Sequence, residues 1–208
     1  GRLLHGKWQE ANAHHTGQAR HSSPRRCRFR QAGITKVADL GCGIGAESLA
    51  LASLDIDVTA FEQDELTAAI ATYNLANFEN VKVEQADVTK LDLSEFDGLF
   101  LDPARRDKSS RKYDPATFSP SYEFVLKTAR TKPTIVKLGP GMPHDQIPQD
   151  AEAVWVSVNG DLVELTLYFG KLRRAVVERA ALLITDNGSF ELSSAETKRT
   201  DAPIGDLE

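Results

Sequence analysis

The sequence predicts a doubly wound α/β fold, with a mostly parallel seven-stranded sheet and an antiparallel C-terminal hairpin strand. From residue 36 onward, short β-rich runs alternate with helical segments, and this alternation with short connections is typical of right-handed βαβ units. A continuous apolar run at residues 97–102 ends in an acid, as expected of a strand buried on both faces. An Asn-Gly pair within residues 153–170 indicates a hairpin.

Each element follows from its residue pattern in chain order. The strands are β-rich runs, of which the first ends in glycines, the third alternates and the second and fourth end in acids. The helices are rich in Ala and Leu. Strands are expected at 37–41, 57–62, 81–86, 97–102 and 134–139, two more within 153–170, and one further β segment within 172–184. Helices are expected at 17–31, 46–53, 65–77 and 119–130.

Composition divides the chain into three parts. Residues 1–35 hold four of the five histidines and a run of arginines without a sustained period, and we expect them to be partly helical or disordered. Residues 36–170 carry the strand–helix alternation and form the predicted main domain. Residues 171–208 are expected to be an extension or a linker to a further domain, with a disordered tail from residue 193.

Composition also excludes several classes of protein. The 208 residues are 41% hydrophobic and 26% charged, which suits a single soluble domain. No apolar run approaches the roughly 18 residues needed to span a bilayer, and no secretory signal is seen, so we expect a cytoplasmic protein without membrane contact. The two cysteines, Cys27 and Cys42, give neither a disulfide framework nor a thiolate metal cluster, and no metal is expected.

The formal net charge of −5, taken whole, argues against a nucleic-acid partner, but the charges are strongly segregated. Residues 1–38 carry eight Lys and Arg against one acid, whereas residues 39–104 carry two Lys against fourteen acids. Residues 105–112 carry five bases and one acid. The basic segments at 20–30 and 105–112 are therefore either solvated surface or a site for phosphates.

A glycine-rich loop, Asp39-Leu40-Gly41-Cys42-Gly43-Ile44-Gly45, follows the first predicted strand. Glycines let a backbone turn tightly and approach a ligand, and the helix that follows offers unpaired N–H groups. The loop lacks the Lys-Ser/Thr ending of a phosphate-binding P-loop, and its G-x-G-x-G spacing differs from the dinucleotide fingerprint G-x-G-x-x-G. A third candidate ligand is S-adenosylmethionine, an adenosine with an amino-acid tail and no phosphate.

D-L-G-C-G-x-G resembles motif I of the class I S-adenosylmethionine-dependent methyltransferases, a Rossmann-like family, and residues 36–170 follow that family's order. The resemblance implies that Glu62 holds both ribose hydroxyls and that Asp87 accepts from the adenine amino group beside Val88. Each acid alone would also suit a helix cap or a turn. The implied cofactor-binding residues are Asp39, Gly41, Cys42, Gly43, Gly45, Glu62, Gln63, Asp87 and Val88.

Asp102 opens the sequence D-P-A-R-R in the position of the family's motif IV, which lies beside the methyl acceptor. Enzymes that methylate exocyclic amines of bases resemble (D/N)-P-P-(Y/F/W), and this chain lacks the second proline and the aromatic residue. D-P-A-R also resembles the D-P-P-R of RNA uridine C5-methyltransferases, but no cysteine nucleophile follows Cys42. We expect Asp102, Pro103 and Arg105 at the catalytic centre, with Asp102 orienting the nucleophile or accepting its proton.

The wider pattern D-P-A-R-R-D, K-L-G-P-G (137–141) and W-V-S-V-N-G-D-L-V-E (155–164) resembles a bacterial group of methyltransferases with a THUMP-like C-terminal domain. THUMP-type modules accompany enzymes that modify structured RNA. The resemblance therefore implies direct methyl transfer to a base of tRNA or rRNA. The residues expected on the substrate side are Arg105, Arg106, Lys137 and Asn159, with Tyr113, Phe118 and Tyr122 as stacking candidates. The alternatives are a small-molecule or protein methyltransferase and a non-catalytic donor-binding module.

Overall fold

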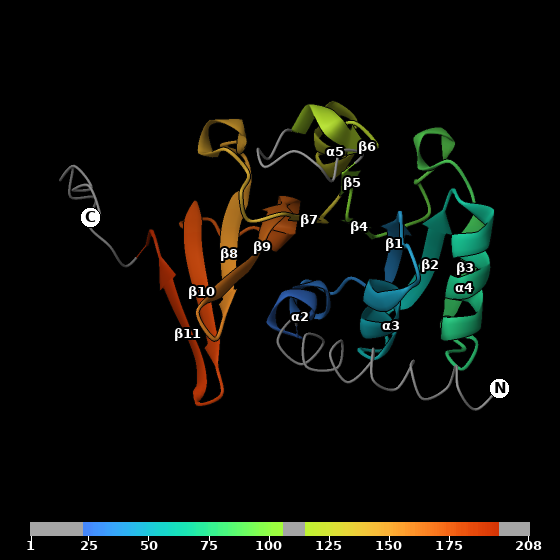
Figure 1. The fold of residues 1–208 in the computed structure, drawn as a ribbon, viewed down its shortest axis with the longest axis horizontal. Coiled ribbons are helices and arrows are strands. Elements are labelled where there is room, and N and C mark those ends of the chain that lie inside the picture. Colours follow the sequence, from blue (N-terminus) through green and yellow to red (C-terminus); the bar gives the residue numbers. More distant parts are fainter. Residues whose placement is uncertain (1–22, 106–114, 196–208) are drawn as a thin grey trace.

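The computed structural model describes residues 23–105 and 115–195. Their main feature is a nine-stranded sheet in the order β11-β10-β8-β9-β7-β4-β1-β2-β3 (Figure 1). The strands are β1 (Lys36–Leu40), β2 (Asp57–Glu62), β3 (Val81–Gln85), β4 (Gly98–Leu101), β7 (Thr134–Leu138), β8 (Glu152–Val158), β9 (Asp161–Phe169), β10 (Arg179–Thr185) and β11 (Gly188–Ser193). A separate two-stranded sheet pairs β5 (Ala104–Arg105) with β6 (Phe118–Ser119).

The α-helices of the described residues are α2 (Ser23–Gln31), α3 (Ala46–Ala52), α4 (Glu65–Leu75) and α5 (Tyr122–Ala129). Short 3₁₀ turns are η1 (Val88–Lys90), η2 (Pro115–Thr117), η3 (His144–Gln146) and η4 (Gly170–Leu172). None of the helices in this part of the chain is long and apolar enough to cross a membrane.

The predicted fold class is confirmed. Strands β3, β2, β1, β4 and β7 pair in parallel, so their carboxyl ends lie at one edge of the sheet. β9 runs antiparallel to both β7 and β8, and the turn between β8 and β9 is the predicted Asn159-Gly160 hairpin. Both turn residues have positive φ, +49° at Asn159 and +94° at Gly160, which explains why this pair is found there.

The sheet extends past the expected seven strands at its C-terminal end, by the further β segment expected within 172–184 and by one strand that was not expected. β10 pairs in parallel with β8 and lies where one more β segment is expected, because Ala180, Leu182 and Ile184 alternate and bury one face. β11 pairs antiparallel with β10 but leaves Phe190 and Leu192 largely exposed. Its side-chain pattern therefore carries no burial signal, and backbone pairing defines the strand. The division into domains stays a prediction.

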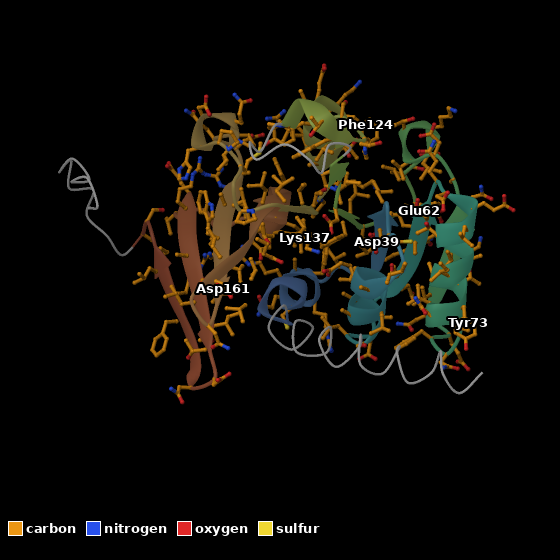
Figure 2. The ribbon with its side chains drawn as sticks, in the orientation of Figure 1. Asp39, Glu62, Tyr73, Phe124, Lys137 and Asp161 are labelled. Carbon is orange, nitrogen blue, oxygen red and sulfur yellow. The ribbon has the colours of Figure 1, made fainter. Side chains whose placement is uncertain are left out.

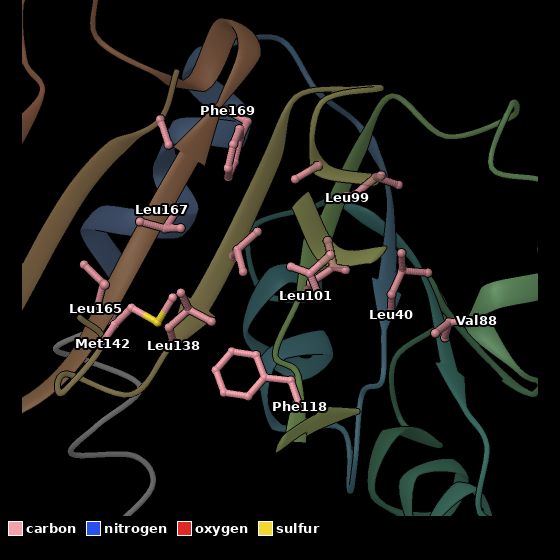
Figure 3. Packing of buried hydrophobic residues seen from close by; sticks show 14 of the residues in the cluster. Leu40, Val88, Leu99, Leu101, Phe118, Leu138, Met142, Leu165, Leu167 and Phe169 are labelled. Atoms are coloured by element: carbon pink, nitrogen blue, oxygen red, sulfur yellow. The ribbon is translucent and has the colours of Figure 1, made fainter. Parts of the chain in front are cut away.

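Two hydrophobic layers sandwich the sheet. On one face α2, α3 and α4 cover a core that includes Phe29, Leu51 and Phe100 (Figure 1). On the other face α5 and the loops around it cover a second core. Figure 3 shows residues of that second cluster, among them Leu40, Val88, Leu99, Leu101, Phe118, Leu138, Met142, Leu165, Leu167 and Phe169.

A buried carboxylate fastens α2 to the C-terminal half of the sheet. The side chain of Glu152, at the start of β8, is fully buried and accepts hydrogen bonds from Arg28 (2.7 and 2.9 Å) and Arg174 (2.6 and 2.8 Å). The Arg28 guanidinium also lies 3.7 Å from the centre of the Tyr168 ring. Burial alone would raise the pKa of Glu152, but the hydrogen bonds from both arginines lower it below its usual value.

Arg28 belongs to the basic segment at 20–30 that the sequence offered for phosphate binding. Its charge is instead used inside the protein, because Glu152 lies opposite it across the core. The structure also pairs Arg30 with the exposed Asp55 at 3.7 Å. The side chains of Arg25 and Arg26, and all of Arg20, lie outside the described residues.

We expect Glu152→Ala to lower the free energy of unfolding by about 3–5 kcal/mol, because it leaves the Arg28 guanidinium buried without its carboxylate. Urea denaturation followed by circular dichroism measures this. Asp150→Ala is the matched control, since Asp150 forms an exposed pair with Arg130 that is worth about 1 kcal/mol or less. Equal losses in the two variants would contradict the structural role assigned to Glu152.

Candidate active site

The carboxyl ends of β1, β2 and β4 meet at a cavity of about 630 Å³. Ligands of open α/β sheets bind beyond the carboxyl ends of the strands, so this is the expected place for a site. In Figure 2, Glu62 lies at this edge of the sheet and Phe124 lies above it on α5, whereas Tyr73 and Asp161 lie away from it. The cavity is lined by Gly41, Cys42, Gly43, Glu62, Gln63, Asp87, Val88, Thr89, Asp102, Ala104, Ser119, Pro120, Ser121 and Phe124.

The glycine-rich loop forms one wall of the cavity. The N–H groups of Gly41 and Cys42 both donate to the carbonyl of Phe61 at 2.9 Å, which turns the chain sharply at the end of β1. Gly41 and Gly43 have φ values of +88° and +56°, a backbone region that side chains disfavour. Open space lies in front of both, so the loop leaves room for a ligand against its backbone.

Gly45 serves a different purpose from the other two glycines. It caps α3 with φ +89°, and a Cβ atom there would lie 2.7 Å from Cδ1 of Leu75 on α4. The residue is therefore required for the close approach of α4 to the loop. It is absent from the cavity lining, so the structure gives it a packing role near the predicted ligand contact.

Glu62 ends β2 with its carboxylate at the cavity. One carboxylate oxygen accepts from the N–H of Gly43 and the other from the N–H of Asp64, both at 3.0 Å. These bonds fix the orientation of the carboxylate. Each oxygen of an ionised carboxylate has two acceptor sites, so both can accept a further hydrogen bond from a ligand. Gln63 lines the cavity beside it.

Asp87 follows β3 and lines the cavity together with Val88. Its carboxylate caps η1, accepting from the N–H and hydroxyl of Thr89 at 3.0 and 2.6 Å. These bonds, with that from Lys90, lower the pKa of Asp87 to about 2. Asp87 is therefore an ionised acceptor at neutral pH, and the buried Val88 places an apolar surface next to it.

Asp39 lies beneath the glycine loop rather than in the cavity. It is 1% exposed, and its Oδ2 atom accepts from the hydroxyl of Ser48 on α3 at 2.5 Å. Burial raises the pKa of Asp39 to about 7, against the hydrogen bond from Ser48, and the nearby charge of Glu47 raises it further. This carboxyl therefore ties α3 to β1 and supports the loop from below.

Asp102 follows β4, lines the cavity and contacts a lysine on the neighbouring strand β7. The Nζ atom of Lys137, on β7, lies 2.9 Å from Oδ2 of Asp102 and 3.6 Å from Oε1 of Glu47 on α3. Lys137, predicted on the substrate side, is thus placed against two carboxylates. Pro103 is buried and leads into β5, which returns the chain to the cavity at Ala104.

The structure does not bring Asn159 to this cavity. Its backbone N–H donates to the carbonyl of Ile184 at 2.8 Å and its amide lies 3.5 Å from Oδ1 of Asp186, because β8 pairs with β10. Arg105 lies in β5, but its side chain is outside the described residues, as are Arg106 and Tyr113.

Two of the predicted stacking residues pack against each other instead. Phe118 is buried in the core and meets the edge of the Tyr122 ring, with their centroids 5.7 Å apart. Among the described residues, Phe124 is the aromatic residue that lines the cavity, and it was not predicted from the sequence. Ser121 accepts from the N–H of Phe124 at 3.3 Å and so caps α5. The Ser-Pro-Ser sequence before the helix signals that cap, but only the β5–β6 pairing brings it opposite Asp102.

Cys42 is the cysteine at the cavity. Its thiol is buried, and burial raises the pKa well above its ordinary value, with the charges of Asp39 and Glu62 adding to the effect. A thiol in this state is a poor nucleophile. Cys27 lies on α2 and does not line the cavity.

Comparison with known proteins gives sequence matches over much of the chain. The family model for the tellurite resistance protein TehB matches residues 29–102. Uncharacterized S-adenosylmethionine-dependent methyltransferases from two strains of Mycobacterium tuberculosis are 26% identical over 170 residues, which cover 78% of this chain and 46% of each relative. The chain thus spans about half the length of these relatives. The ribosomal RNA small subunit methyltransferase A of Listeria innocua is 41% identical over 61 residues, or 29% of this chain and 21% of that protein.

Solved structures share the fold. A candidate methyltransferase from Porphyromonas gingivalis superposes with a TM-score of 0.62 at 21% identity, covering 87% of this chain and 51% of that one. A candidate RNA methyltransferase from Pyrococcus horikoshii superposes with a TM-score of 0.50 at 20% identity, covering 71% of this chain and 79% of that one. At these identities the likeness concerns the fold.

We expect Asp39→Asn to remove a pH dependence of stability. The folded pKa of about 7 exceeds the ordinary value of 3.8, so between these values the folded state holds a proton that the unfolded state releases. Wild-type stability therefore falls as pH rises from about 4 to 7, by an Asp39 contribution of up to about 4 kcal/mol. Urea denaturation across this pH range measures it, and parallel curves for the two proteins would contradict the assignment.

Proposed function

We propose that the chain is a class I S-adenosylmethionine-dependent methyltransferase and that its cavity binds the donor for transfer to a base of structured RNA, from tRNA or rRNA. The main support for a donor site is that one cavity is lined by Gly41, Gly43, Glu62, Asp87 and Asp102. These residues lie at the ends of four different strands; the sequence predicted the first four at the cofactor and Asp102 at the catalytic centre.

The chemistry of the cavity fits S-adenosylmethionine. The glycine backbone leaves open space, which an amino-acid tail would fill without a Cβ clash. Glu62 has acceptor positions left for two hydroxyls, and the low pKa of Asp87 keeps it an acceptor for an amino group. Val88 offers an apolar contact for a ring. Gln63 completes the wall, while Asp39 and Gly45 act on the loop from behind.

When bound, the donor supplies a methyl group on a positively charged sulfur. Asp102 is the residue we assign to the acceptor, because it lines the cavity at the position of motif IV and has a carboxylate 42% exposed. It would orient the nucleophile and accept its proton. Phe124 and Pro120 offer flat apolar surfaces across the cavity for a base. A cysteine-dependent C5 transfer is not part of the proposal, because Cys42 is a buried thiol.

Support for an RNA acceptor comes from the basic sequence next to the cavity. Ala104 and Ser119 both line the cavity and pair with each other across β5 and β6. The sequence between them contains the five Lys and Arg residues of 105–112, including Arg105 and Arg106. Basic side chains beside a catalytic site bind the phosphates around a target nucleotide. A ribosomal RNA methyltransferase is among the proteins with sequence similarity to this chain. A THUMP-like continuation and a cytoplasmic location stay predictions.

We expect Glu62→Gln to weaken S-adenosylmethionine binding about 10- to 100-fold, because a charged acceptor for hydroxyl groups is lost. Isothermal titration calorimetry measures the dissociation constant. Glu65→Gln, on the exposed first turn of α4, removes the same charge nearby and should bind like the wild type. Equal affinity in the wild type and Glu62→Gln would defeat the donor assignment.

We expect methyl transfer from labelled donor to total cellular RNA, with the product identified by nucleoside analysis. Asp102→Asn should lower the rate about 10²- to 10⁴-fold while changing donor affinity by much less, because a proton acceptor is lost and the glycine loop is kept. Label in protein or small molecules with none in RNA would replace the RNA proposal by the corresponding alternative. Donor binding without transfer to any acceptor would favour the non-catalytic module.

A further inference from the structure

The charged side chains that line the cavity, among the described residues, are all carboxylates: Glu62, Asp87 and Asp102. Two more carboxyl groups lie nearby: Glu47 shares Lys137 with Asp102, and the charges of Glu47 and Asp102 add to the burial that raises the pKa of Asp39. The site is therefore strongly acidic on the side where β1, β4 and α3 meet. This acidity requires an explanation, because like charges held together repel one another.

Lys137 is a basic residue that lies within this acidic cluster. Its ammonium lies 2.9 Å from Asp102 and 3.6 Å from Glu47, so one cation bridges the end of β4 and the first turn of α3. Its charge also acts to lower the pKa of Asp39 at the end of β1. The Lys137 and Glu47 side chains are 30% and 15% exposed, so water and salt screen this charge less than that of Lys90, which is 80% exposed beside Asp87.

The next step rests on the proposed function. S-adenosylmethionine carries a positive sulfonium, whereas the product S-adenosylhomocysteine has a neutral sulfide in its place and is otherwise alike. An acidic cavity attracts the donor more than the product by Coulomb interaction, and a cation paired with a lining carboxylate, as Lys137 is with Asp102, reduces that difference. The charge of Lys137 consequently weakens binding of the cationic donor more than binding of the neutral product.

We propose that Lys137 is a specificity-determining residue that sets how strongly the cavity prefers the cationic donor over the neutral product. It holds Asp102 and Glu47 in one arrangement and offsets part of their charge. Lys137 is thus assigned to the donor side of the reaction, where the sequence had suggested a substrate contact.

The test is calorimetry of S-adenosylmethionine and S-adenosylhomocysteine binding to the wild type, Lys137→Gln and Lys137→Arg. Measurements at pH 8 and low ionic strength keep Asp39, with its pKa of about 7, mostly ionised. We expect Lys137→Gln to increase the ratio of the product Kd to the donor Kd about two- to fivefold, the size of a unit-charge effect across a solvated cavity. Lys137→Arg keeps the charge and should keep the wild-type ratio.

Two controls separate charge from structure. Lys127→Gln removes the same charge from the exposed last turn of α5 and should leave the ratio unchanged. The double variant Asp102→Asn with Lys137→Gln removes one charge of each sign, so its ratio should return close to the wild-type value. A purely structural role for Lys137 would instead make the double variant at least as abnormal as Lys137→Gln.

The outcomes distinguish this inference from the proposed function. A ratio that is unchanged in Lys137→Gln, or affinities for both ligands that change by the same factor, would overturn the role of Lys137 while donor binding stands. Binding of neither ligand to the wild type would overturn the proposed function and the inference with it. A changed ratio that is restored in the double variant supports both.

Discussion

The site depends on one constraint: β1, β2, β3 and β4 run parallel and in register, so their carboxyl ends reach the same edge of the sheet. Leu40 pairs with both Phe61 and Leu101, and Glu62 pairs with Gln85. The residues that follow these positions are therefore brought together although they are far apart in the chain. A slip of one residue in any pairing would turn a site carboxylate to the wrong face.

The electrostatics of the molecule follow from this arrangement. The net charge of −5 conceals a strong segregation, because residues 39–104 carry fourteen acids against two Lys, whereas basic residues dominate 1–38 and 105–112. Burial raises the pKa of Asp39, the charges of Glu47 and Asp102 raise it further, and the charge of Lys137 acts in the opposite direction. Asp87 is affected in the opposite direction, since hydrogen bonds at the rim lower its pKa. The carboxyl groups that the sequence motifs predicted for the site, Asp39 and Asp87, therefore differ in their pKa values.

A second set of charges acts only on the scaffold. Glu152 joins Arg28 of α2 and Arg174 to the start of β8, and Arg174 pairs further with Glu191 on β11. Segments from both ends of the described chain are connected through one buried carboxylate. Composition does not predict this structural use, because Arg28 lies in the same arginine-rich stretch as Arg25, Arg26 and Arg30.

The sequence by itself determined the order of strands and helices, the hairpin at Asn159-Gly160 and most of the cavity-lining residues of the proposed donor site. It could do so because strand alternation, glycines with positive φ and acids at strand ends are local patterns. Only the tertiary structure decided the roles of Lys137, Arg28 and Phe124, and the place of Asn159, because each depends on a partner distant in the chain. It also added β11 and decided that β10 pairs in parallel with β8, because the sequence predicts a β segment but not its partner strand.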